Sequence, residues 1–395
     1  MMRKGSVVLF SCLMTVAVFA APGASVAQNG PYYQGGAGVI SESWTLAIFV
    51  SGDNNLESYW DSASLPGLLN LPANDAFTIV AFVDRLSTEG TEVVEISGSE
   101  YSVVATYEEM NFGDGATFQW FLEDVDLNFP SDKLAVIAWD HGYAWRYISD
   151  DDSSDGDRIT MPEFQAAIEG AGVYIDVLAF DACNMAAIEV EYQVAQTGLV
   201  GIIVASEESV PTTGFPYDTM FIPTATDTSR SPEQLATDMV LAFQEFYEPQ
   251  TWASTVALSA VDLAALAATA GAVQAWTASM HSCLPAYEDS YQAILKEAYF
   301  AWCTHYHVDI VDLGDTILAD PAITDEALRA STSAMVAAVD GTVIAHWGGS
   351  AALDNRGMTL WWGVGGDWKF YSEAYTEVAY AMDMGWWAFL DDYND

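Results

Sequence analysis

The sequence predicts an α/β fold in which a mostly parallel central sheet is flanked by helices. Continuous apolar runs at 134–140, 175–181 and 200–206 are typical of central strands that are covered on both faces. Helical patterns lie between these runs, as the crossover connections of parallel strands require. Two segments with period-two alternation, 92–97 and 101–107, are joined by a Gly-Ser turn and indicate an antiparallel hairpin at a sheet edge.

The N-terminal residues are expected to precede the folded part of the chain. Two basic residues stand before an apolar run over 6–21, and small residues follow up to Ala27, which is typical of a secretory signal peptide cleaved near that point. A membrane anchor would need a longer span and a charged stop beyond it. Residues 28–43 are rich in Gly, Ser and Tyr and fit a flexible leader. We therefore expect residues 1–27 to be removed, giving a secreted or periplasmic protein that is not attached to a membrane.

The folded part begins with two further apolar segments. A first strand is expected at 44–51, followed by a turn at 52–55, and a second strand is expected at 77–84. Helices are expected at 161–171 and after Cys183, where Met185, Ile188, Tyr192 and Ala195 recur at helical spacing.

A longer helix is expected at 231–247, with signals for its first residue. Ser231 is the predicted cap, Pro232 takes the first helical position, and Gln234 completes a capping box.

After residue 250 the sequence predicts a strand and an Ala-rich helix. A further helix is expected near 324–339, and strands are expected at 341–346 and 357–362. We interpret 44–250 as a core and 251–395 as a C-terminal α/β extension packed on it.

Acidic residues dominate the charge. The formal net charge is -45, from 11 Lys and Arg against 56 Asp and Glu. Such a chain repels nucleic acid and anionic membranes, whereas it attracts basic substrates. Adaptation to a saline habitat is the alternative cause, and the spread of the acids along the chain favours it for most of the charge.

Three cysteines remain after the predicted signal peptide. An odd number in an exported protein suggests one disulfide and one cysteine outside it. Cys283 and Cys303 flank a short stretch, and a bridge between them would contribute about 3 kcal/mol. Cys303, His305 and His307 could also be metal ligands, but they lack a fourth partner. A disulfide cysteine beside two surface histidines is the favoured interpretation.

Two of the expected strands end at reactive side chains. The run 134–140 leads into His141 and Gly142, and the run 175–181 leads into Ala182 and Cys183. Because the carboxyl ends of parallel strands meet at one edge of a sheet, the histidine and the cysteine are expected to lie close together. A thiolate attacks a carbonyl carbon, and an imidazole promotes the thiolate and then protonates the leaving amine. A buried packing cysteine and a simple His-Gly turn are the alternatives.

Backbone groups next to these side chains could assist the same chemistry. A helix that begins at Asn184 would place its positive end at the sulfur and lower the thiol pKa. The N–H groups of Gly142 and Cys183 are candidate oxyanion donors, and Gly142 would let a substrate approach closely.

Several fragments follow one another in a specific order and spacing: "FVSGDNNLESY", "IAWDHGYAW", "DVLAFDACNMAAIEVEY", "VASEESVPTTGFPY" and "GWWAFLDDY". Together they resemble the clostripain-like cysteine peptidases of the caspase and gingipain clan. The resemblance implies a caspase-like three-layer sandwich with Cys183 as nucleophile and His141 as general acid/base. The chain differs from the family pattern at Ala144, where Gly is more frequent, and at Asn184, where an apolar residue is usual.

The resemblance also implies cleavage of protein or peptide substrates after Arg or Lys. Asp181 matches the acid at the base of the specificity pocket, where a carboxylate would pair with a guanidinium or ammonium group. The alternative for Asp181 is a cap of the turn after the strand. Glu207 and Glu208 are second candidates for the pocket, with plain surface charge as their alternative.

The acidic segment at 149–160 is a candidate calcium site. Asp151, Asp155 and Asp157 surround a Gly turn and offer the hard oxygens that calcium prefers, although the closing Glu of an EF-hand is missing. The resemblance implies calcium dependence and self-cleavage in this connection. Arg158, in an expected exposed loop, is the candidate processing site.

We therefore expect a secreted, monomeric cysteine endopeptidase. The rival is a catalytically inactive acidic protein on the same fold that binds calcium or a basic partner, which the presence of both His141 and Cys183 disfavours. A third possibility keeps the peptidase chemistry but gives Asp181 only a structural role.

Overall fold

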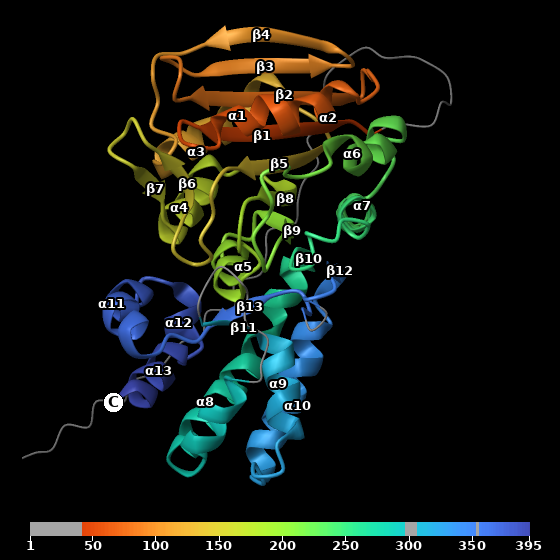
Figure 1. Cartoon of the computed structure of the whole chain (residues 1–395). Coiled ribbons are helices and arrows are strands. Elements are labelled where there is room, and N and C mark those ends of the chain that lie inside the picture. Colours follow the sequence, from red (N-terminus) through yellow and green to blue (C-terminus); the bar gives the residue numbers. More distant parts are fainter. Residues whose placement is uncertain (1–41, 297–305, 353–354) are drawn as a thin grey trace, which may run out of the picture. The chain divides into compact units, whose positions relative to one another are not determined.

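The computed structural model describes residues 42–296, 306–352 and 355–395 (Figure 1). Cys303 and His305 lie outside these ranges, so the predicted Cys283–Cys303 disulfide stays a prediction. His307, expected at the surface, is instead buried in a short strand. Within the described ranges, no helix is both long enough and apolar enough to cross a bilayer.

A nine-stranded sheet organises the described chain. Its strands follow the order β12-β10-β9-β8-β5-β1-β2-β3-β4. They are β1 Trp44–Gly52, β2 Phe77–Arg85, β3 Glu92–Ser97, β4 Glu100–Thr106, β5 Lys133–Trp139, β8 Ile175–Asp181, β9 Val200–Ala205, β10 Ala257–Asp262 and β12 Val343–Gly348. The five central strands, from β9 to β2, pair in parallel, whereas the strands at both edges pair antiparallel. The predicted central strands and the hairpin are confirmed.

Two small sheets and fourteen helical elements complete the described part. The small sheets pair β6 Ile148–Asp151 with β7 Asp157–Ile159, and β11 His307–Asp309 with β13 Thr359–Trp361. The helical elements are α1 Glu57–Tyr59, the π-helix η1 Trp60–Ser64, α2 Leu65–Leu69, α3 Gly115–Asn128, α4 Met161–Ala171, α5 Ile188–Ala195, α6 Tyr217–Thr226, α7 Pro232–Tyr247, α8 Leu263–Ile294, α9 Ile310–Ala319, α10 Glu326–Asp340, α11 Gly365–Tyr375, α12 Ala379–Asp383 and α13 Trp386–Asn394.

Helices cover both faces of the sheet, as in a three-layer sandwich. Alternate residues of β1 belong to two different cores: Phe49 packs on one face with Phe118 and Phe121 of α3, while Ile48 belongs to the other face with Met239 of α7. A strand buried on both faces must be apolar at successive positions, which is why these strands read as continuous apolar runs. The predicted α/β fold class is confirmed.

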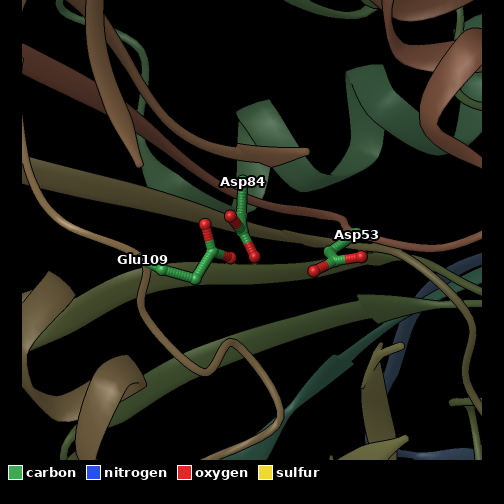
Figure 2. Close-up of side chains that lie close together, drawn as sticks. All are labelled: Asp53, Asp84 and Glu109. Atoms are coloured by element: carbon green, nitrogen blue, oxygen red, sulfur yellow. The ribbon is translucent and has the colours of Figure 1, made fainter. Parts of the chain in front are cut away.

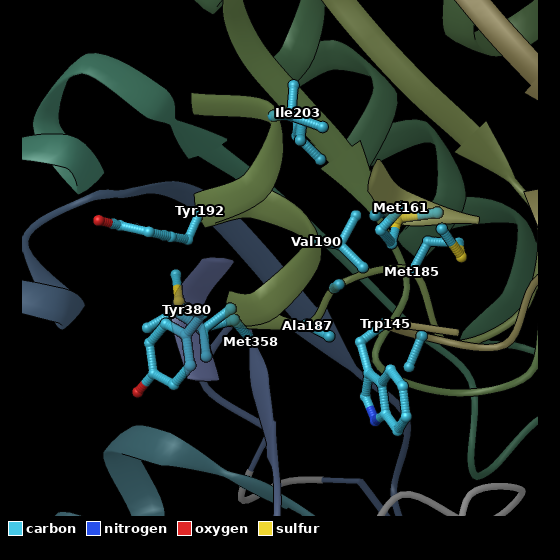
Figure 3. Close-up of a cluster of buried hydrophobic side chains, with 14 of the residues drawn as sticks. Trp145, Met161, Met185, Ala187, Val190, Tyr192, Ile203, Met358 and Tyr380 are labelled. Atoms are coloured by element: carbon cyan, nitrogen blue, oxygen red, sulfur yellow. The ribbon is translucent and has the colours of Figure 1, made fainter. Parts of the chain in front are cut away.

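The C-terminal part packs on the sheet through α5. Figure 3 shows Val190 of α5 beside Met161, Met185 and Trp145, with Met358 and Tyr380 of the C-terminal part in the same cluster of buried side chains. Strands β10 and β12 also extend the main sheet antiparallel. Residues after 250 therefore support the same sheet that carries the candidate site.

The helix after Cys183 begins later than predicted. Asn184 has a positive φ of 60°, and α5 begins only at Ile188. The backbone between them is held in place from two sides, because Asn184 N–H donates to the Glu208 carbonyl and the Ala186 carbonyl accepts from Thr359 N–H. The prediction of a helix at Asn184 is therefore wrong, whereas the capping box at Ser231 and Gln234 is confirmed.

Candidate active site

The sheet register brings His141 and Cys183 to the same level. In the parallel pair of β5 and β8, Trp139 lies opposite Asp181. His141 and Cys183 each follow two residues after this matched pair. Both side chains, half-buried, line one cavity of about 110 Å³. The structure thus brings together the two residues that the strand ends predicted.

Segments from four regions form the wall of this cavity. The lining residues are Leu56, Tyr59, Trp139, Asp140, His141, Asp181, Ala182, Cys183, Val210, Pro211, Thr212 and Gly214. They come from the turn after β1 and the short helix α1, from the ends of β5 and β8, and from the loop after β9. The cavity therefore lies at the carboxyl edge of the parallel strands, where open α/β sheets bind ligands.

His141 is held by an asparagine in the turn after β1. Its Nε2 lies 3.0 Å from Oδ1 of Asn55. Because an amide oxygen can only accept, this contact places the ring proton on Nε2 and leaves Nδ1 as the basic nitrogen. Burial lowers the pKa of His141, with a further decrease from Arg158, while Asp150 and Asp152 partly oppose the shift. The imidazole is therefore neutral at neutral pH, as a general base must be.

A buried network fixes the turn that carries Asn55. Asn54 Nδ2 donates to Asp140 Oδ1 at 2.8 Å and to the Asp150 carbonyl at 3.0 Å. Asp140 also accepts a hydrogen bond from Asp150 N–H. Burial raises the pKa of Asp140 well above its usual value, although these hydrogen bonds favour the charged form. The end of β5, the turn after β1 and strand β6 are thereby tied together beside His141.

The backbone around Cys183 explains the glycine at 142. A Cβ atom on Gly142 would lie 2.7 Å from the Cys183 carbonyl oxygen and 2.8 Å from Met185 Sδ. Glycine is therefore required by the close approach of the Cys183 strand end. Two backbone hydrogen bonds join this segment to Tyr147 and Ser149, and they use Tyr143 N–H and the His141 carbonyl, on either side of Gly142. The Gly142 N–H thus takes no part in those two bonds.

The sulfur of Cys183 lies beside the loop after β9. Its Sγ is 3.7 Å from the Val210 carbonyl oxygen. Because α5 begins at Ile188, its N-terminus does not adjoin the sulfur as expected. The left-handed backbone at Asn184 explains an asparagine there, since Asn tolerates positive φ and here its Nδ2 donates to the Glu207 carbonyl. Ala144 also has a positive φ, of 48°, which glycine would adopt more easily.

Asp181 lies in the wall of the cavity and is 5% exposed. Its Oδ2 accepts from Phe215 N–H at 3.2 Å and from the Tyr217 hydroxyl at 3.0 Å. Burial raises the pKa of Asp181 to about 7, while these two bonds oppose the increase. Gly214 has a φ of 62° and approaches so closely that a Cβ there would lie 2.9 Å from Oδ2. A side chain at 214 would therefore cover the carboxylate.

Glu207 and Glu208 are placed differently from Asp181. Both side chains are buried, so they are not the surface charges that the alternative described. Neither lines the cavity. Glu207 Oε1 accepts from Gly357 N–H at 2.7 Å, and burial together with nearby Asp309 raises its pKa well above the usual value. Glu207 thus contacts the C-terminal part of the chain.

The three acids of the predicted calcium site do not converge. Asp151 is buried, and its carboxylate accepts from Phe112 N–H and Ser154 N–H. Asp155 and Asp157 are exposed, and Asp157 Oδ2 accepts from Asn111 Nδ2. Among the residues that the structure describes, the acids whose oxygens lie within 4.8 Å of one another are a different set, so the structure does not bring these three acids together.

Arg158 lies in a strand and not in the expected loop. Its Nε is 2.6 Å from Asp150 Oδ1, and its guanidinium lies 4.4 Å from the centre of the Tyr147 ring. Strand β7 pairs Arg158 opposite Asp150 of β6, and the next residue, Ile159, is fully buried. The peptide bond after Arg158 is therefore protected by pairing in this conformation.

Sequence reasoning missed one residue that contacts His141 and two that line the cavity. Asn55, Leu56 and Tyr59 come from the segment after β1, which was interpreted only as a turn. Part of the signal was available, because a strand was expected at 44–51 and the carboxyl ends of parallel strands lie at one edge of a sheet. That β1 is the neighbour of β5 is known only from the structure. Tyr217, in contrast, follows a loop whose path the sequence does not predict.

Solved structures of C11 proteases have the same fold. A secreted C11 cysteine protease from Bacteroides thetaiotaomicron, solved with an irreversible peptide inhibitor, matches with a TM-score of 0.69 and 16% identity over 87% of this chain and 99% of that chain. An inactive zymogen C11 protease from Parabacteroides distasonis matches with a TM-score of 0.67 and 18% identity, over 88% and 99% of the two chains. The fold is thus that of C11 proteases.

Sequence comparison assigns the chain to a family. The family model described as the clostripain family, Peptidase C11, matches residues 48–385. Clostripain from Hathewaya histolytica is 30% identical over 140 residues, which cover 31% of this chain and 26% of that relative's length. The chain belongs to the clostripain family of cysteine peptidases, and the predicted resemblance is confirmed.

Proposed function

We propose that the chain is an extracytoplasmic cysteine endopeptidase that cleaves peptide bonds after Arg or Lys. The observation that carries the proposal is the shared cavity, which His141, Cys183 and Asp181 all line at the ends of two paired strands. Its volume of about 110 Å³ is well below the ~300–1,000 Å³ of pockets for drug-sized ligands, so it suits one substrate side chain.

In the proposed reaction, His141 Nδ1 accepts the thiol proton as the Cys183 sulfur attacks the carbonyl carbon of the substrate. The resulting oxyanion is stabilised by backbone N–H groups, for which Gly142 and Cys183 are the candidates. As the C–N bond breaks, His141 returns the proton to the leaving amine and a thioester remains. His141 then removes a proton from water, hydroxide adds to the thioester, and collapse restores the thiol and releases the carboxylic acid.

Asp181 accounts for the proposed specificity for Arg and Lys. Its carboxylate lies in the cavity wall and would accept a charge-assisted hydrogen bond from a guanidinium or ammonium group. Its existing donors, Phe215 N–H and the Tyr217 hydroxyl, keep its orientation fixed before a substrate binds. The net charge of -45 would further attract basic substrates.

The experiment is an assay with fluorogenic peptides that end in Arg, Lys, Asp or Leu, with and without calcium. The proposal predicts turnover of the Arg and Lys peptides alone and none with Cys183→Ala. Equal turnover of all four peptides would remove Asp181 from the specificity pocket. No cleavage under either condition would favour the inactive binding protein on the same fold.

Self-processing after Arg158 is part of the proposal. Because Ile159 is buried and β7 is paired with β6, the hairpin must open before the Arg158–Ile159 bond can be cut. Mass spectrometry of the mature protein should show a fragment ending at Arg158, absent from Arg158→Ala and from Cys183→Ala. Arg146→Ala is the matched control and should process normally. An unchanged fragment pattern in Arg158→Ala would refute this site.

Calcium dependence also belongs to the proposal, since the chain offers oxygen ligands that suit this ion.

Export beyond the cytoplasm is supported by the signal-peptide pattern over 1–27 and by the secreted relative of the same fold. N-terminal sequencing of the exported protein should begin after Ala27. A chain that keeps residue 1 outside the cytoplasm would contradict cleavage there.

A further inference from the structure

Three carboxylates outside the cavity converge at the edge of the sheet. Asp53 directly follows β1, and Asp84 lies in β2 one residue before its end, opposite Ser51 of β1. Glu109 comes from the segment between β4 and α3. Each contributes one oxygen to a group whose members all lie within 4.8 Å of one another. Figure 2 shows the Asp84 and Glu109 carboxylates turned toward each other, with Asp53 beside them.

Two oxygens of these carboxylates are buried without a hydrogen-bond partner in the described part of the chain. Asp53 is 1% exposed and Asp84 is 0% exposed, and the orphan atoms are Asp53 Oδ1 and Asp84 Oδ2. A buried carboxylate oxygen without a partner is strongly disfavoured, and adjacent acids increase the effect. Arg85, the basic residue next to Asp84, does not relieve it because its Nη2 pairs with Asp61 Oδ1 at 2.9 Å.

A single divalent cation would satisfy all three groups. Calcium binds oxygen ligands at about 2.3–2.6 Å, so two ligands of one ion lie at most about 5 Å apart. The separation within this group fits that limit. A set of carboxylate oxygens without nitrogen or sulfur favours calcium over zinc or copper. Glu109 is exposed, which gives an ion access from solvent and leaves room for water ligands.

We propose that Asp53, Asp84 and Glu109 bind one calcium ion. This site differs from the predicted set of Asp151, Asp155 and Asp157. The two regions are connected nonetheless, because Asp152 N–H donates to the Asp53 carbonyl at 2.8 Å.

The ion would also stabilise the turn that orients His141. Asp53 stands two residues before Asn55, whose Oδ1 contacts His141 Nε2. Asn54, between them, is tied to Asp140. A cation bound to Asp53 therefore restricts the turn whose side chains position the imidazole. This link to catalysis rests on the proposed function, whereas calcium binding itself does not.

Calcium binding is tested on the full chain carrying Cys183→Ala, so that neither self-cleavage nor catalysis affects the result. The protein is freed of metal with a chelator and titrated with calcium chloride by calorimetry at about 0.15 M salt, which screens diffuse attraction to the acidic surface. We expect one saturable site and a rise in Tm that saturates with it. Magnesium at the same concentration serves as the comparison and should bind more weakly.

Substitutions at the proposed ligands and outside them locate the site. Glu109→Gln should weaken calcium binding about tenfold or more, because even the outer-shell partners of metal ligands typically contribute 10–100-fold. Asp155→Asn removes an exposed acid outside the cluster and should bind calcium like the parent. Normal binding by Glu109→Gln, loss of binding in Asp155→Asn, or no saturable binding in the parent would each overturn the proposal.

Asp84→Asn distinguishes a ligand from a residue needed only for folding. Without metal, this substitution removes a buried carboxyl group that lies beside other acids, so the Tm in chelator should equal or exceed that of the parent. Addition of calcium should then raise the Tm of the parent but not that of Asp84→Asn. A calcium-dependent rise of the same size in both proteins would overturn the proposal.

Discussion

Asp181 and Asp84 occupy similar places in the sheet but have different surroundings. Each lies at the carboxyl end of a parallel strand and is buried. Asp181 Oδ2 accepts two hydrogen bonds and burial raises its pKa to about 7. Burial, reinforced by Glu109, Asp151 and Asp53, raises the pKa of Asp84 to about 8. Under the two proposals, donors prepare the Asp181 carboxylate for a substrate cation, whereas neighbouring acids prepare the Asp84 carboxylate for a metal ion.

Among the tests of this comparison, Asp181→Asn should have the largest effect, which is on cleavage of Arg and Lys peptides. Removing one partner of a buried charge pair costs 2–5 kcal/mol, so kcat/KM for Arg and Lys peptides should fall about 30-fold or more. Calcium affinity should not change. The matched control is Asp176→Asn on the same strand, where the carboxylate accepts from Leu134 N–H and is not part of the cavity lining. An equal loss in both variants would mean that Asp181 acts only through the strand.

The pH dependence of cleavage sharpens the role assigned to Asp181. Because its pKa is about 7, the carboxyl becomes neutral below that pH and its attraction for a guanidinium is lost. We expect kcat/KM for an Arg peptide to fall up to tenfold per pH unit below about 7. The limb that reports His141 should appear at lower pH, since burial lowers that pKa. Asp181→Asn should lose the limb near 7, and its persistence would assign it to another group.

A smaller effect is expected from Asn55→Ala, which affects the proposed link between the calcium site and His141. Loss of a single hydrogen bond to His141 corresponds to about 0.5–1.5 kcal/mol, so kcat should fall up to about tenfold with KM little changed. Calcium should still bind and still raise Tm. The effect of calcium on kcat should be smaller in Asn55→Ala than in the wild type, because the ion acts through this turn. An undiminished calcium effect on kcat would break that link.

A separate effect concerns how the stability of the fold depends on pH. Asp181 has a higher pKa in the folded state than in the unfolded chain, so the folded state holds a proton that the unfolded state releases between about pH 4 and 7. This group therefore stabilises the fold at low pH, and its contribution is lost as pH rises through about 7. Between pH 5 and pH 8, Tm in chelator should fall more for the Cys183→Ala parent than for the same chain carrying Asp181→Asn. Equal slopes would show that Asp181 does not hold a proton in the folded state.

Much of the fold followed from local patterns in the sequence. Continuous apolar runs identified the central strands, since burial on both faces leaves no alternation, and the capping box fixed the first residue of α7. The late start of α5 could not be predicted, because Asn184 is held by the Glu208 carbonyl, 24 residues away in the chain. Tertiary hydrogen bonds there override the helical spacing of Met185 and Ile188.

The candidate site was predictable where it depends on strand ends. His141 and Cys183 follow paired strands, so the parallel register places them together. The cluster of Asp53, Asp84 and Glu109 was not found, because it needs the pairing of β1 with β2 and a loop that returns after β4. A dense acidic run in the sequence pointed to Asp151, whose carboxylate instead accepts from Phe112 and Ser154.

The most direct test of the peptidase assignment is covalent labelling by a peptide electrophile that ends in Arg. The full chain is incubated with the reagent, digested, and analysed by mass spectrometry for adducts at each cysteine. We predict one adduct, on Cys183, that is blocked by an excess of Arg peptide and slowed by His141→Ala. Labelling of Cys283 or Cys303 in preference to Cys183, or equal labelling by a matched reagent that ends in Asp, would contradict the assignment.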